Sequence, residues 1–125
     1  MEFIHAPKAC ASVGPYSHCV KAGSTYYLCG QVPFHPVTGE VVGNGMKEQA
    51  VQTLANMKAV LEAASLAVTD IAKTTVFVTN MDDFAAFNEV YAAFMGEHRP
   101  ARVCVEVSNI AHGCLLEMDA ICFKE

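Results

Sequence analysis

The stretch Pro100-Ala101-Arg102-Val103-Cys104-Val105-Glu106-Val107 has the pattern of a β-strand with two different faces. Three valines alternate with Arg102, Cys104 and Glu106, which is the period of two that a strand imposes on its side chains. Pro100 fits only at the beginning, because proline has no N–H to donate to a strand ladder. We expect the valines to form a packing face. The opposite face presents a guanidinium fork that suits a carboxylate or a phosphate, or simply a solvated arginine.

The composition limits the classes of protein to which this chain can belong. The chain has 125 residues, which is one domain's worth, so we expect a single domain over residues 1–125. Apolar residues make up 53% and charged residues 17%, which hints that some apolar surface is buried against another subunit. The net charge of −5 and the lack of a basic stripe argue against a nucleic-acid partner. No membrane span and no secretory start are visible, so we expect a cytoplasmic protein without a membrane partner.

The cysteines and histidines do not form a recognisable metal or disulfide pattern. Without a secretory signal, six free thiols are expected rather than three disulfides. No close Cys or His pairs with metal-ligand spacing occur, so we expect no metal site. The six cysteines are Cys10, Cys19, Cys29, Cys104, Cys114 and Cys122.

The remaining periodicity predicts an α+β domain. A helix beginning near Asn44, whose side chain could cap it, has apolar residues spaced by three and four. A second helix begins at Asp82 and Asp83 and ends at Gly96. Strands are expected over 17–21, 25–30, 71–79, 100–107 and 114–123, and the first helix over 46–64. This order predicts a mixed sheet with two helices on one face, and other copies of the chain as cover for the opposite face.

The last predicted strand carries two carboxylates in an apolar run. Its residues are apolar on both faces, which is typical of a strand buried on both sides. Glu117 and Asp119 lie within it, and a buried carboxylate must be paired, hydrogen-bonded or protonated. Arg102, expected on the neighbouring strand, is the natural partner. This pairing could also be purely structural, and Asp119 could simply be solvated near the strand end.

Several short motifs together resemble one known family. They occur in the family's order and spacing over nearly the whole chain, and the sequence is similar to the RidA/YjgF/UK114 family of imine deaminases. The motifs are Gly14–Ser17, Gly30–Pro33, Thr38–Glu40, Asn56–Met57, Lys73–Val78, Phe84 with Asn88 and Tyr91, Pro100–Arg102 and the strand of Glu117. The resemblance implies a chorismate-mutase-like α+β fold and a homotrimer with a central barrel. It also implies three sites in the clefts between subunits.

The same resemblance implies a reaction. Family members hydrolyse reactive enamines and imines, such as 2-aminoacrylate, to 2-keto acids and ammonia. By resemblance, Arg102 holds the substrate carboxylate and Glu117 orients or activates the attacking water. An iminium carbon is already electrophilic, so no metal or cofactor is expected. The other substrate-binding residues implied are Tyr16, Cys29, Gly30, Asn88 and Cys104.

The chain departs from the family pattern at several positions. Cys29 replaces a usual Ser or Thr and is a weaker donor, and the loop before Arg102 is a few residues shorter. Arg99 replaces a frequent Phe and could widen the cleft, add a positive charge or lie in solvent. A covalent role for Cys104 is unnecessary when water attacks. The alternatives are a non-catalytic small-metabolite binder on the same fold and, less favoured by the acidic charge, an endoribonuclease.

Overall fold

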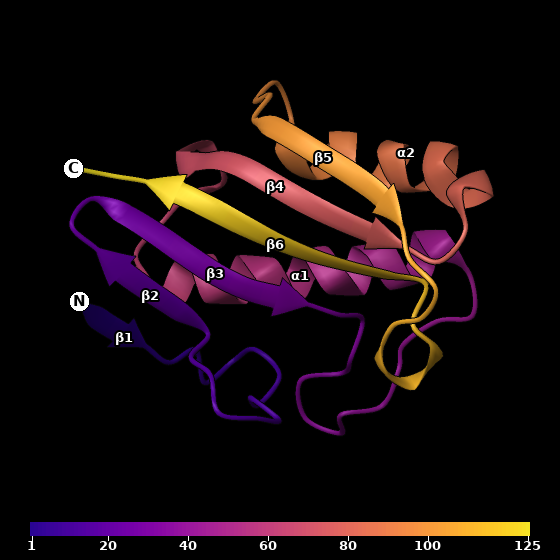
Figure 1. Cartoon of the computed structure of the whole chain (residues 1–125), viewed down its shortest axis with the longest axis horizontal. Coiled ribbons are helices and arrows are strands. Elements are labelled where there is room, and N and C mark those ends of the chain that lie inside the picture. Colours follow the sequence, from indigo (N-terminus) through magenta and orange to yellow (C-terminus); the bar gives the residue numbers. More distant parts are fainter.

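The computed structural model describes residues 1–125, and its strands form one mixed sheet with two helices on one side (Figure 1). The strands are β1 (Glu2–Ile4), β2 (Cys19–Ala22), β3 (Thr25–Gln31), β4 (Ile71–Val78), β5 (Ala101–Glu106) and β6 (Leu116–Phe123). The helices are α1 (Met46–Ala63) and α2 (Phe84–Met95). The strand order is β1-β2-β3-β6-β4-β5, so the last strand of the chain lies in the middle of the sheet. The α+β prediction is confirmed.

One parallel pair distinguishes this sheet from a meander. β5 runs parallel to β4, and all other neighbours are antiparallel. A parallel pair needs a crossover connection, and α2 supplies it between the two strands. β5 is one of the two edge strands of the sheet, with α2 behind it (Figure 1).

The helix-covered face of the sheet holds the hydrophobic core. The apolar stripe predicted for α1 is buried, with Leu54, Met57 and Leu61 each no more than 2% exposed. Leu116 and Met118 of β6 are fully buried beneath the helices. Burying each of these side chains contributes about 1.5–3 kcal/mol to folding, so this layer dominates the stability of the chain.

The opposite face of the sheet is open in the single chain. Val103 and Val105 of β5 are 43% and 41% exposed, and Phe123 at the end of β6 is 53% exposed. The prediction that the valine face packs is therefore wrong within one chain, where the Arg102 face packs instead. The prediction that β6 is buried on both sides is also wrong within one chain, because its residues alternate between buried and half-buried up to the exposed Phe123.

The structure also corrects several element boundaries. β1 was not predicted, because its three residues are too few to show a period. Gly45, and not the Asn44 side chain, stands at the N-cap of α1. Asp82 and Asp83 belong to a 3₁₀ turn, Met81–Asp83, that precedes α2. Gly96 ends α2 as predicted, with φ of 63°.

Two further observations concern the chain as a whole. All six cysteines are free thiols, as predicted. Neither helix combines the length and the apolar character needed to cross a bilayer.

Candidate functional site

Arg102 is held firmly on the helix-side face of the edge strand β5. Its Nη1 donates a hydrogen bond to Asn88 Oδ1 of α2 at 2.8 Å. The guanidinium carbon lies 4.9 Å from the ring centroid of Tyr91 and 5.2 Å from that of Phe84. Aromatic faces attract a cation and restrict its position. The Tyr91 hydroxyl is in turn hydrogen-bonded to Thr74 Oγ1 at 2.8 Å, so the aromatic support is itself anchored.

This arginine opens onto a cavity of about 510 Å³ between α2 and β5. No acidic residue lines it, and the single ion pair of the structure, Lys47 with Glu89, lies elsewhere. The lining residues are Asn88, Tyr91, Ala92, Arg99, Pro100 and Arg102. A guanidinium with free N–H groups and no carboxylate partner is suited to bind an anionic ligand in a bidentate manner.

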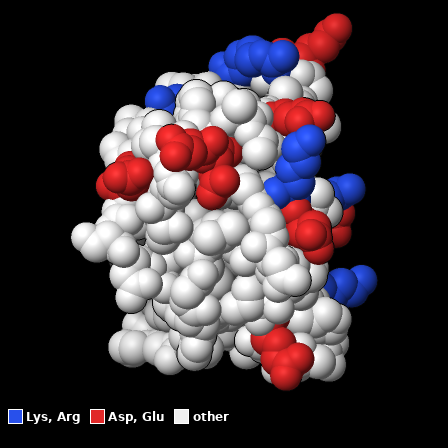
Figure 2. Space-filling view, turned by 90° about the vertical axis from the view of Figure 1, so that its right-hand side faces the viewer, with Lys and Arg blue, Asp and Glu red and all other residues white.

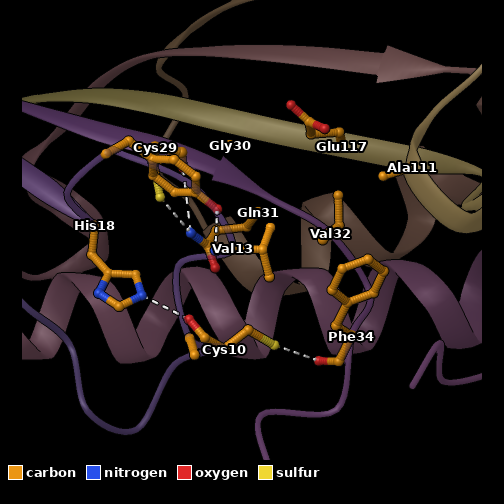
Figure 3. Close-up of a pocket in the computed structure, with 12 residues that line it drawn as sticks. Cys10, Val13, His18, Cys29, Gly30, Gln31, Val32, Phe34, Ala111 and Glu117 are labelled. Atoms are coloured by element: carbon orange, nitrogen blue, oxygen red, sulfur yellow. Dashed lines mark hydrogen bonds between the residues drawn. The ribbon is translucent and has the colours of Figure 1, made fainter. Parts of the chain in front are cut away.

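Glu117 lies on the other face of the sheet, in a second cavity of about 360 Å³. In Figure 3, Glu117 extends from β6 on one side of this cavity, and Cys10 and Phe34 lie on the opposite side. Tyr16, Cys29 and Gly30 also line it, so three of the predicted substrate-binding residues are gathered around the predicted catalytic carboxylate. The rest of the lining is Ala11, Val13, His18, Gln31, Val32 and Ala111.

Gly30 allows the Glu117 carboxyl group to lie directly against the backbone of β3. A Cβ atom at position 30 would lie 3.0 Å from Glu117 Cδ and even closer to Oε2. The pairing of β3 with β6 is irregular between Leu28 and Gln31, which is the sign of a bulge at this point. Gly30 therefore lies at a bulge and leaves room for the Glu117 carboxyl group.

The environment of Glu117 favours its protonated form. Burial, and secondarily the nearby Asp119 carboxylate, raise the pKa of Glu117 above its ordinary value. A carboxyl group with a raised pKa exchanges protons more readily near neutral pH, which suits a general acid or base.

A set of buried polar contacts builds the wall of the Glu117 cavity. His18 accepts a hydrogen bond from the Ala6 N–H at Nδ1, 3.0 Å, and its Nε2 lies 2.7 Å from Cys10 O. Asn56 of α1 donates through Nδ2 to two carbonyls of the loop after β3, Val32 O and Phe34 O, both at 2.9 Å. The sequence offered Asn56 only as part of a motif, because its role depends on a loop 22 residues away.

A second buried amide of α1 holds the chain that leads into β6. Gln49 of α1 donates to Gly43 O at 3.0 Å and accepts from the Leu115 N–H at 2.8 Å. It thereby ties the loop before α1 to the start of β6, two residues before Glu117. Sequence reasoning missed Gln49, although a polar residue on the apolar stripe of a helix is a usable signal of a buried side chain that forms hydrogen bonds.

Arg102 and Glu117 are not neighbours within one chain, contrary to the prediction. β4 lies between β5 and β6, and the connection from β5 to β6 crosses it rather than forming a hairpin. Arg102 pairs with Thr74 on the buried face of β4, whereas Glu117 pairs with the half-exposed Phe77. The two side chains therefore lie on opposite faces of the sheet. The predicted site residues form two clusters: Asn88 lies with Arg102, and Tyr16, Cys29 and Gly30 lie with Glu117.

The surroundings of the two cysteines assigned to the site favour the thiol over the thiolate. Burial raises the pKa of Cys104, and the Arg102 charge offsets this only in part. Burial also raises the pKa of Cys29, whose sulfur accepts a hydrogen bond from Gln31 Nε2 at 3.1 Å. A nucleophilic cysteine needs a lowered pKa, so neither environment favours covalent chemistry. No group of three or more His, Cys, Asp or Glu side chains is arranged to hold a metal ion.

Comparison with known proteins gives consistent results. The sequence model of the family described as "Endoribonuclease L-PSP" matches residues 5–124. A RutC family protein of Pyrococcus horikoshii is 47% identical over 124 residues, covering 99% of this chain and 98% of the relative. A 2-iminobutanoate/2-iminopropanoate deaminase of Escherichia coli is 44% identical over 124 residues, with 97% and 96% covered. The crystal structure of E. coli TdcF with bound serine superposes with a TM-score of 0.94 at 40% identity, with 100% of both chains covered.

Proposed function

The chain belongs to the RidA/YjgF family, also described as Endoribonuclease L-PSP, and we propose that it is an imine deaminase of this family. The proposed reaction is hydrolysis of 2-imino acids, including those formed from 2-aminoacrylate, to 2-keto acids and ammonia. The name of the relative that is 44% identical over nearly the full length supports this assignment. The single observation that carries it is the unpaired Arg102 guanidinium, aimed into a cavity without any acid.

The two halves of the proposed site come from different copies of the chain. Arg102 and Glu117 lie on opposite faces of one sheet, so a single chain cannot present both to one small substrate. The open face of the sheet carries Val103, Val105 and Phe123, an apolar surface typical of an interface. We propose a homotrimer with the open faces turned inward as a barrel, in which Arg102 of one copy and Glu117 of another line each intersubunit cleft.

In this cleft the chemistry needs little more than positioning. Arg102, braced by Asn88 and Tyr91, binds the substrate carboxylate through two N–H groups and fixes the C=N group in place. Water attacks the imine carbon and forms a carbinolamine, and loss of ammonia then leaves the C=O of the keto acid. Glu117, whose pKa is raised, takes a proton from the water and returns it to the departing nitrogen. Tyr16 and backbone groups near Gly30 and Cys104 would line the space around the substrate.

The first experiment measures keto-acid release from 2-iminopropanoate formed in a coupled assay. Arg102→Ala is expected to abolish activity, and Arg102→Lys to be nearly as harmful because lysine lacks the planar fork. Thermal unfolding of each variant shows whether the fold is intact. An Arg102→Ala protein as active as the unmodified one would contradict the proposal.

A mixing experiment tests the shared site directly. Arg102→Ala and Glu117→Gln are each expected to be inactive alone. Unfolding and refolding the two together lets them assort randomly, and roughly a quarter of the clefts then receive both intact residues. Activity should return to about that fraction of the unmodified value. If mixed trimers are found by mass spectrometry and remain inactive, the two residues do not share a cleft.

A non-catalytic metabolite-binding role is the second candidate. The weak Cys29 donor in the site favours it, and the related TdcF structure contains bound serine. Calorimetry that shows keto-acid binding, with no turnover of any imine tested, would support this role over catalysis. A ribonuclease role is disfavoured by the net charge of −5, and Figure 2 shows no continuous basic stripe on the side in view. Intact RNA after incubation at low salt would eliminate it.

A further inference from the structure

The cavity that holds Arg102 contains a second guanidinium that the proposed reaction does not use. Arg99 lines the same space, in the short connection between α2 and β5. Neither arginine has a carboxylate within ion-pair distance, because the only ion pair in the structure joins Lys47 to Glu89. Two unpaired guanidinium groups facing one cavity repel each other, and an anion with charge at two points relieves this repulsion.

Arg99 is exposed to solvent, and two backbone carbonyls orient its side chain. Its Nη1 donates to Gly96 O at 2.6 Å and to His98 O at 2.9 Å. Both bonds use the same nitrogen, so the other N–H groups of the guanidinium have no protein partner. The side chain is therefore oriented while most of its donors remain available, which is a suitable arrangement for binding a carboxylate.

We propose that Arg99 makes this cavity selective for dicarboxylic 2-imino and 2-keto acids. Arg102 binds the carboxylate next to the C=N or C=O carbon, and Arg99 binds the carboxylate at the end of the substrate side chain. This assignment rests on the proposed function for the role of Arg102, and it adds the substrate class.

Both arginines reach the cavity from one short segment of chain. Arg99 lies two residues before β5 and Arg102 is the second residue of β5, and both side chains line the cavity. A bound diacid would place one carboxylate at each guanidinium. Asn88 and Tyr91 occupy the space between α2 and the strand, and Ala92 and Pro100 provide apolar walls for the methylene groups.

The kinetic test compares two imines of similar size in the same protein. Amino-acid oxidases generate the dicarboxylic imine from glutamate and the monocarboxylic imine from norvaline. Arg99→Gln is expected to lower kcat/KM for the glutamate-derived imine about tenfold, and to change the norvaline-derived value less than about twofold. The matched control Lys58→Gln removes one charge from an exposed position on α1 and should change neither value. Equal losses for both imines, or no loss for either, would overturn the proposal.

A binding test separates this inference from the proposed function. Calorimetry compares the affinity of the protein for 2-oxoglutarate with its affinity for 2-oxopentanoate, which has the same number of carbon atoms but lacks the second carboxylate. The unmodified protein should prefer 2-oxoglutarate about tenfold, Arg99→Gln should lose the preference, and added salt should weaken it. If this holds while no imine is turned over, the deaminase proposal fails and the dicarboxylate site stands. If imines are turned over but no preference exists, the dicarboxylate site fails alone.

Discussion

Replacing Gly30 by alanine should disable the proposed catalytic carboxylate without unfolding the protein. The added Cβ would lie 3.0 Å from Glu117 Cδ, whereas ordinary van der Waals contact begins at 3.4 Å. The carboxyl group must therefore retreat by several tenths of an ångström, and its nearer oxygen by more. A misplacement of about 1 Å at a reacting group can cost about 100-fold in rate, so we expect kcat/KM to fall about 10- to 100-fold.

The stability of the same variant should change little. Gly30 does not have a left-handed backbone, so alanine fits the local conformation. Alanine in a strand gains about 0.5–1 kcal/mol over glycine, and moving the end of one flexible side chain off its rotamer costs about as much. The free energy of unfolding should therefore stay within about 1 kcal/mol of the original, as measured by urea denaturation followed by circular dichroism.

Two controls make this prediction refutable. Gly45→Ala adds the same methyl group where no atom lies within 4 Å, and should retain full activity. In a Glu117→Gln background, Gly30→Ala should cause no further loss, because the group it displaces is already inactive. Full activity in Gly30→Ala would refute the proposed role of this contact. So would an equally large loss of activity when Gly30→Ala is added to Glu117→Gln.

Three other predictions concern neighbouring residues. Glu117→Gln should raise the melting temperature at pH 7, because the raised pKa means that the folded state disfavours the ionised carboxylate. Melting scans should show this advantage shrinking as the pH falls through the raised pKa of the folded state towards 4.5, and lost at lower pH, where the carboxyl is protonated in both states. Cys104→Ala should keep kcat within about twofold, since its thiol pKa is raised, and a loss of more than tenfold in a folded protein would indicate a chemical role. Gln49→Ala should destabilise the chain by about 1–3 kcal/mol, because the Leu115 N–H and the Gly43 carbonyl lose their partner, and denaturant unfolding against a Lys58→Ala control at an exposed position of the same helix measures it.

The interior of the fold was predictable from local patterns. The apolar period of α1, the β-branched run of β4 and the glycine at the end of α2 each specify an element through interactions within a few residues. The order of these elements left two helices to cover one face of the sheet. Because no further element remained in the chain, the opposite face was expected to be uncovered. Arg102 could be identified as a candidate site residue because it is a charged residue that alternates with valines on a predicted strand.

The relation between Arg102 and Glu117 was not predictable in the same way. Adjacent strands in the sequence were assumed to pair, but a parallel β4–β5 pair required a helical crossover, and β6 then entered the sheet on the other side of β4. Strand order depends on contacts between distant segments, and no local pattern records it. Local residue patterns are enough to assign each of these side chains to its strand. That the arginine and the glutamate lie on opposite faces of the sheet follows only from the folded chain, because the face of a side chain depends on strand register and the neighbour of a strand depends on the path of the whole chain.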